Sequence, residues 1–239
     1  MSAGARPTLD LSTFAEDGFS TFLWGSSRAV VNRLLFAMVR AHDPEPIWLD
    51  LRGRELADGE PGPVELDWIP RDHLYLAEEP ASARPQDAIA NMALWTVVRA
   101  DEPDAAVSRL ADFVRLPPIA QQILQRADVG AARHALAVAN SDRVRGEYPT
   151  TVEGVRPIVR ALMDGPLLPF FGAVGPPGAG RMAFDLVFEV RAPDLAHWGD
   201  GTLLAEKVPP GHPVRLGTPI RLRDIAGLAS AFGSAPGPK

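Results

Sequence analysis

Residues 18–51 alternate between two apolar, strand-like runs and one helix-like run, and this alternation restricts the fold more than any other feature of the chain. The run 18–24 is rich in aromatic and β-branched residues, which is typical of a strand. Residues 29–41 place apolar side chains at helical spacing. The run 47–51 is short and largely apolar, as in a buried strand. A strand–helix–strand unit of this length predicts a right-handed crossover between parallel strands.

Later segments continue the alternation. Helical patterns occupy 85–127, in pieces, and 151–163, whereas residues 53–63 are typical of a loop. The predicted strands are 73–76, 134–139, 167–174 and 182–191, followed by a closing hairpin of 202–208 and 219–225. We therefore predict an α/β fold of three layers, with a mostly parallel sheet, helices on both of its faces and a C-terminal hairpin.

The domain organisation follows from length and composition. A chain of 239 residues is long enough for one large α/β domain, which we place at 18–232. Residues 1–17 resemble a loose N-terminal leader. The Pro- and Gly-rich residues 233–239 are predicted to be a disordered tail.

Composition excludes several classes of function. The formal net charge is −6, without a dominant basic stretch, which argues against nucleic-acid binding. The absence of cysteine excludes a disulfide scaffold and a thiolate nucleophile, and it is typical of an intracellular protein. No apolar run approaches the roughly 18 residues that span a bilayer, and the N-terminus has no apolar signal core. We therefore expect a cytoplasmic protein with no membrane partner.

The sequence carries none of the common catalytic signatures. It contains no GxSxG, GxGxxG or HExxH motif. The histidines are scattered and lack the spacing of metal ligands. They are His42, His73, His134, His197 and His212. We assign no catalytic residue and no metal ligand.

The turn made by Gly25, Ser26, Ser27 and Arg28 joins the first strand to its helix, where phosphate-binding loops occur. Such a loop presents amides at a helix N-terminus, a lysine for the β- and γ-phosphates, and a Ser or Thr that holds Mg²⁺. The chain has no lysine before Lys207. Two interpretations stay open: a plain turn capped by a serine, or a degenerate loop whose amides and Arg28 hold an anion.

The glycine-rich string 175–181 is a second candidate phosphate loop, with arginine in place of lysine and Met182 in place of Ser or Thr. A phosphate loop must open a helix. Residues 182–190 instead alternate with a period of two, which is typical of a strand. We therefore predict a hairpin loop here, without a phosphate site.

Asp142 follows the apolar strand 134–139 after two polar residues. In P-loop ATPases a carboxylate at such a strand end steers Mg²⁺ or water, although a strand-end Asx turn has the same sequence signature. Together, the strand–turn–helix–strand unit at 18–51, this acidic strand end and the strands within 167–191 resemble the core of RecA-like P-loop ATPases.

The resemblance implies nucleotide-binding positions at Gly25, Ser26, Ser27, Arg28 and Asp142. ATP and Mg²⁺ are then possible ligands, but we expect no hydrolysis because the lysine and the Ser/Thr ligand of Mg²⁺ are missing. RecA-like domains bind nucleotide between subunits, so the resemblance also implies a homo-oligomer or a complex with a related ATPase. It therefore predicts a catalytically inactive homologue that acts as a regulatory or assembly partner.

Two other functions remain compatible with the sequence. The first is a divergent ATPase in which Arg28 replaces the lysine, although the planar guanidinium is a poor substitute for a compact ammonium group. The second is a small-molecule binding module that uses the crevice at the carboxyl ends of the strands.

Overall fold

The computed structural model describes residues 9–15, 18–43, 47–50, 74–76, 134–143, 151–164 and 167–232. The predicted loop at 53–63, the helical pieces at 85–127 and the tail at 233–239 lie outside the described residues.

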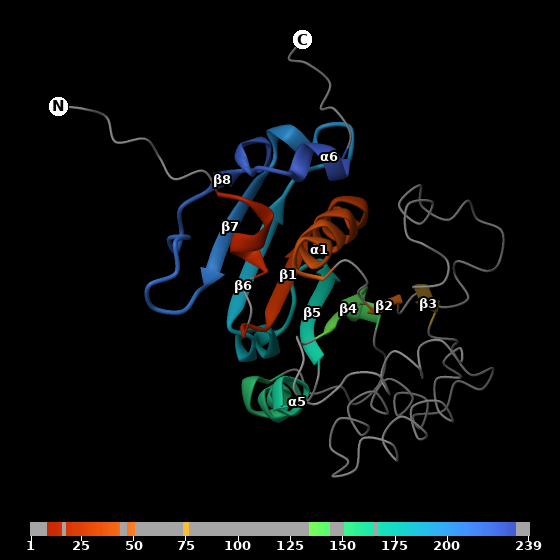
Figure 1. Ribbon diagram of the computed structural model, residues 1–239, viewed down its shortest axis with the longest axis vertical. Helices are drawn as coiled ribbons and strands as arrows, with labels where there is room; N and C mark the ends of the chain where they lie inside the picture. Colours follow the sequence, from red (N-terminus) through yellow and green to blue (C-terminus); the bar gives the residue numbers. More distant parts are fainter. Residues whose placement is uncertain are drawn as a thin grey trace.

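The described residues form a sheet of eight strands, in the order β3-β2-β4-β5-β1-β6-β7-β8 (Figure 1). The strands are β1 (Thr21–Gly25), β2 (Ile47–Asp50), β3 (Leu74–Leu76), β4 (His134–Ala139), β5 (Leu167–Val174), β6 (Leu186–Arg191), β7 (Thr202–Lys207) and β8 (Ile220–Arg221). Pairing is parallel from β3 through β6 and antiparallel for β6–β7 and β7–β8. The predicted α/β class, the mostly parallel sheet and the C-terminal hairpin are confirmed.

The helix α1 (Arg28–His42) links β1 to β2 and packs on β1, β5 and β4. Because β5 and β4 lie between β1 and β2 in the sheet, α1 crosses both of them. The close approach depends on Gly172 of β5, where a Cβ atom would lie 2.9 Å from Leu35 Cδ2. The glycine therefore leaves room for the Leu35 side chain between the helix and the sheet.

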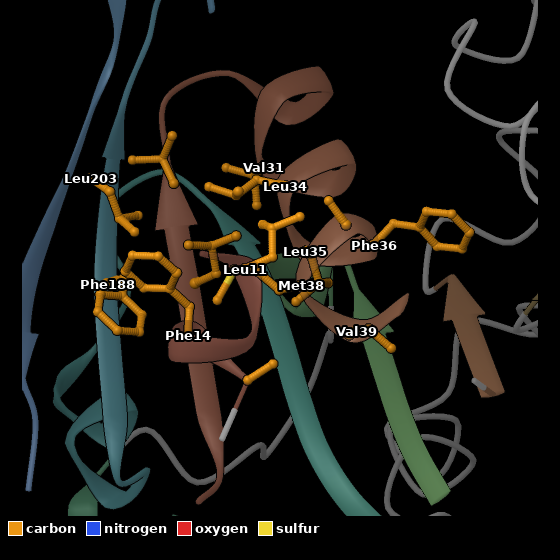
Figure 2. Close-up of a cluster of buried hydrophobic side chains, with 14 of the residues drawn as sticks. Leu11, Phe14, Val31, Leu34, Leu35, Phe36, Met38, Val39, Phe188 and Leu203 are labelled. Atoms are coloured by element: carbon orange, nitrogen blue, oxygen red, sulfur yellow. The ribbon is translucent and has the colours of Figure 1, made fainter. Parts of the chain in front are cut away.

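The main hydrophobic core lies between α1 and one face of the sheet (Figure 2). The buried side chains that α1 contributes are Val30, Val31, Leu34, Leu35, Phe36, Ala37, Met38 and Val39. Leu23, Phe170 and Phe188 of the strands belong to the same cluster. The short C-terminal helix α6 (Leu228–Phe232) also contacts α1.

Part of the segment that we expected to be a loose leader packs into this core. Residues Leu11–Phe14 form the 3-10 helix η1, whose N-cap is Asp10. The Phe14 side chain is fully buried, and its ring meets the Phe188 ring edge to face with centroids 5.5 Å apart. Figure 2 shows these two rings side by side. The compact domain therefore begins at least as early as Leu9.

The helix α5 (Val152–Asp164) packs against β5 and against the 3-10 helix η7 (Ala179–Ala183). Successive strand residues point to opposite faces, so Phe171 faces away from α1 when its neighbour Phe170 faces toward it. The Phe171 ring packs on Phe184, with centroids 5.0 Å apart. The segment that contains Phe184 therefore lies against the face opposite α1.

The predicted hairpin within 167–191 is wrong. β5 and β6 are not paired with each other, since each pairs in parallel with β1, one on either side. Residues 175–185 return the chain from the carboxyl end of β5 to the amino end of β6, through η7. The alternation that begins at Met182 is therefore a strand only from Leu186 onward. Phe184 lies before this strand, and its ring packs against the rings of Phe22 and Phe171.

Candidate functional site

The five predicted site residues lie at the carboxyl edge of the parallel strands. Gly25 ends β1, Ser26 and Ser27 form the connection, and Arg28 is the first residue of α1. Asp142 lies in the 3-10 turn η6 (Ser141–Arg143), directly after β4. In the sheet β1 and β4 are separated only by β5.

The structure brings Arg28 and Asp142 together. Arg28 Nη2 donates to Asp142 Oδ2 at 3.2 Å, and Arg28 Nη1 donates to the side-chain oxygen of Asn140. The other carboxylate oxygen of Asp142 accepts from the backbone N–H of Val174, at the end of β5, at 2.9 Å. The two charged side chains are 26% and 21% exposed, so the pair is partly buried and still reached by solvent. Asp142 therefore joins α1, β4 and β5 at one point.

Asn140 is the residue of this cluster that sequence reasoning missed. It is fully buried and has a φ of +60°, the left-handed conformation that asparagine tolerates better than most residues. The turn redirects the chain so that Asn140 and Asp142 both reach the same guanidinium. Ser141 donates to the backbone oxygen of Gly172 at 3.0 Å. The Asn-Ser-Asp string after a buried strand was the available signal, since these residues favour turns.

Gly25 is needed for packing. A Cβ atom at this position would lie 2.5 Å from the backbone oxygen of Val190, closer than non-bonded atoms approach, and 3.1 Å from Val31 Cγ2. The Gly25 carbonyl accepts from the N–H of Gly175 at 2.9 Å, which joins the ends of β1 and β5. Steric crowding between β6 and α1 thus accounts for this glycine without any ligand.

Ser27 occupies the N-cap position of α1 but makes no side-chain cap hydrogen bond. Its backbone oxygen accepts from the N–H of Val31 at 2.9 Å, as the first bond of the helix. Ser26 is exposed. The serine-cap interpretation therefore holds for the backbone geometry of Ser27 and not for its hydroxyl group.

These residues do not fit a Mg²⁺–ATP ligand. The guanidinium of Arg28 already donates to Asn140 and Asp142. Only Ser26 and Ser27 separate β1 from α1. A phosphate-binding loop instead wraps the phosphates with about six residues ahead of its lysine.

Lys207, the first lysine in the chain, is used elsewhere. Its Nζ donates to the backbone oxygen of Met182 at 2.9 Å and to that of Phe184. Burial lowers the pKa of the Lys207 ammonium, and the nearby Asp185 carboxylate partly offsets this effect. Lys207 therefore caps the carbonyl groups at the end of η7.

The second glycine-rich string, 175–181, is organised around its own arginine. Arg181 Nε donates to Glu206 Oε2 at 2.8 Å, and Nη1 donates to the backbone oxygens of Pro177 and Gly178, both at 3.0 Å. The guanidinium thus fills the loop that an anion would otherwise enter. The segment that follows is a five-residue 3-10 helix and not the start of a long α-helix.

A groove of about 370 Å³ lies beside the end of β1, bordered by the first residues after β5 and the last residues of β6. Its lining is mostly apolar, with one serine and one Glu–Arg pair. The lining residues are Trp24, Ser26, Gly175, Pro176, Glu189, Val190, Arg191, Ala192 and Pro193. Apart from Ser26, it shares no residue with the predicted nucleotide positions.

Neither metal ligation nor membrane insertion finds support within the ranges that the structure describes. No group of three or more His, Cys, Asp or Glu side chains there is arranged to hold a metal ion. None of the helices in those ranges has the length and apolarity that crossing a membrane requires.

No protein-family model matches the sequence, and no curated protein matches it. The site is therefore interpreted from its own residues.

Proposed function

We propose that this protein is a catalytically inactive RecA-like homologue that acts as a regulatory or assembly partner. The observation that carries the proposal is the Arg28–Asp142 ion pair with Asn140 as its third member. The pair joins the two positions at which the RecA-like resemblance would place a phosphate contact and a Mg²⁺-steering carboxylate. Each charge neutralises the other, so neither is available to a nucleotide without breaking the pair.

In this proposal the protein has lost ATP hydrolysis but retains the ability to assemble with other subunits. Removing the phosphate-binding lysine abolishes stabilisation of the transferred phosphoryl group but leaves the outer packing surfaces of a domain unchanged. The ion pair supports this view, because it stabilises the carboxyl edge of the sheet without a ligand. We therefore propose a homo-oligomer or a complex with a related ATPase.

The Arg28–Asp142 ion pair also argues against the alternative of a divergent ATPase. An arginine that replaced the lysine would have to point toward the bound phosphates, whereas Arg28 donates to Asn140 and Asp142. Freeing it would leave the Asp142 carboxylate with a single partner, the N–H of Val174. Such a rearrangement opposes nucleotide binding.

The first test measures hydrolysis and binding with the full-length chain. We expect no turnover that reaches about 1 s⁻¹, the low end of typical enzymes, and no heat of binding when ATP and Mg²⁺ are titrated in a calorimeter. Arg28→Ala is the matched variant, because a true Arg28-dependent ATPase loses its activity in it. Turnover that survives repurification and disappears in Arg28→Ala would overturn the proposal.

The second test addresses assembly. Specific interfaces bury at least about 1,000 Å² in total, so a lasting complex gives a stable mass shift in light scattering. We expect a mass above that of the 25.7 kDa monomer, either alone or with a purified RecA-like ATPase from the same cells. A strict monomer at high concentration that also leaves the mass of such an ATPase unchanged would contradict the assembly role.

A further inference from the structure

We propose that the groove beside the end of β1, called here the Trp24 groove, binds an uncharged planar ring that carries an N–H group, such as a fused nitrogen heterocycle. The groove is bounded by Trp24, by Pro176 after β5 and by Pro193 after β6. Its volume of about 370 Å³ lies within the roughly 300–1,000 Å³ range of small-molecule sites. This inference goes beyond the proposed function, because it does not use Arg28 or Asp142.

Trp24 is held in place as a rigid surface for a ring. The indole Nε1–H donates to Glu206 Oε2 at 3.2 Å. The guanidinium carbon of Arg181 lies 5.9 Å from the centroid of the indole ring, within the range of a cation–π contact. Arg181 in turn donates to the same Glu206 oxygen at 2.8 Å. An aromatic platform fixed in advance loses little conformational entropy when a ligand binds to it.

The polar lining has an unused hydrogen-bond acceptor. Glu189 Oε2 accepts from Arg191 Nη2 at 2.6 Å. Among the described residues, the other carboxylate oxygen, Oε1, accepts no hydrogen bond, although the Glu189 side chain is only 18% exposed. An N–H group on a ligand would donate a hydrogen bond to that oxygen, which as a carboxylate oxygen is an acceptor only.

The charges in the groove select against a charged ligand. Glu189 and Arg191 form an ion pair, so the lining carries no net charge. The remaining surfaces near Trp24 are those of Pro176, Val190 and Pro193. A flat ring can contact these apolar surfaces and the indole together, while its N–H reaches Glu189. A flexible or strongly ionic molecule would bind the same lining with lower affinity.

The experiment uses benzimidazole as the probe, with the full-length chain under mildly alkaline conditions in which the ring is uncharged. Saturation-transfer NMR and calorimetry give the dissociation constant, which we expect to be about 0.1–1 mM for a ligand of about nine heavy atoms. We expect Trp24→Ala to weaken binding about tenfold or more, the usual loss when an aromatic stacking partner is removed. Leu216→Ala, on an exposed side chain outside the groove lining, is the control and should leave binding unchanged.

A second probe, 1-methylbenzimidazole, lacks the N–H group and tests the role of Glu189. It should bind the wild-type protein several-fold more weakly than benzimidazole, and this difference should vanish in Glu189→Ala. If Trp24→Ala does not fold, Trp24→Phe and this pair of probes still decide the question. Binding too weak to saturate at several millimolar, or equal affinity in Trp24→Phe, Glu189→Ala and wild type, would overturn the inference. ATP turnover that depends on Arg28 would instead contradict the proposed function and leave this groove unaffected.

Discussion

Arg28 and Asp142 lie 114 positions apart in the chain, and their side chains form a 3.2 Å ion pair beyond the end of β5. The pair connects the first turn of α1 with the turn after β4, and through Val174 it also holds the end of β5. Three segments of the sheet edge thus depend on one guanidinium and one carboxylate.

A double-mutant cycle on Arg28→Ala and Asp142→Ala measures this pair. We expect a coupling free energy of about 0.5–1 kcal/mol that decreases with salt. Asp142→Ala alone should cost about 1–3 kcal/mol, because it also removes the acceptor of the Val174 N–H. Urea unfolding gives each value. The Arg191–Glu189 pair, whose arginine is more exposed, is the control. If the coupling free energy of Arg28–Asp142 does not exceed that of Arg191–Glu189, the result would argue against a structural role for Arg28–Asp142.

Gly25→Ala should destabilise the protein by roughly 1–3 kcal/mol or more, the usual cost of overpacking. The added methyl group would lie 2.5 Å from the backbone oxygen of Val190, which has no freedom to move aside. Gly175→Ala is the matched control: nothing lies within 4 Å of its Cβ position, but its φ of +85° strains an alanine. We expect the control to lose only about 1 kcal/mol. Thermal unfolding that ranks the two variants in the reverse order would refute the packing explanation of Gly25.

Lys207→Met removes the donor to the Met182 and Phe184 carbonyls and should cost about 1–3 kcal/mol near neutral pH. Burial lowers the pKa of Lys207 below its ordinary 10.5, so the folded protein releases this proton at a lower pH than the unfolded chain does. Between the two pKa values the unfolded chain binds more protons, so this group makes stability rise with pH in the window just below 10.5.

The difference in unfolding free energy between wild type and Lys207→Met isolates that contribution. We expect the difference to grow as the pH rises through this window, because only the wild type carries the titrating ammonium. A difference that shrinks would mean that the folded state raises the pKa of Lys207. Lys207→Arg retains a donor and serves as the control for the loss of the cap.

Asp10→Asn tests the N-cap of η1. Hydrogen bonds from the Ser12 hydroxyl first, and then from the Thr13 backbone, lower the pKa of Asp10 below its ordinary 3.8. The stability that Asp10 contributes is therefore complete above pH 3.8 and is lost as the pH falls through the folded-state pKa. At neutral pH the variant should lose only about a few tenths of a kcal/mol, because asparagine ranks with aspartate as an N-cap and the change removes only the negative charge. Acid unfolding curves of wild type and variant should converge at low pH; a constant gap at every pH would contradict the capping role.

The elements with strong local signals were predictable from the sequence. The strand 134–139 has the same bounds in both descriptions, and the helix predicted for 29–41 is observed from Arg28 to His42. The prediction also selected Arg28 and Asp142, because the RecA-like resemblance implies a phosphate contact at the first position and an acidic residue at the second. Their contact follows from the placement of β5 between β1 and β4.

Other features depend on contacts that no local pattern contains. The period of two in 182–190 indicates an extended chain but does not show which strand it pairs with. The pairing of β6 with β1 therefore could not be predicted from the sequence. The helix η1 spans four residues, too few for a periodic signal, and is held by the burial of Phe14. Asn140 is defined by a backbone conformation that the sequence permits without requiring it.

The placement of β1 also has a consequence for the nascent chain. Its two hydrogen-bonded neighbours, β5 and β6, are the segments Leu167–Val174 and Leu186–Arg191. During synthesis β1 therefore leaves the ribosome long before either neighbour exists. Its apolar residues have no pairing strand until about 140 further residues have been made. Pairing over such sequence distances is slow and leaves hydrophobic surface open to aggregation. Translation that ended before residue 167 would thus release a chain in which the first strand has neither of its two pairing partners.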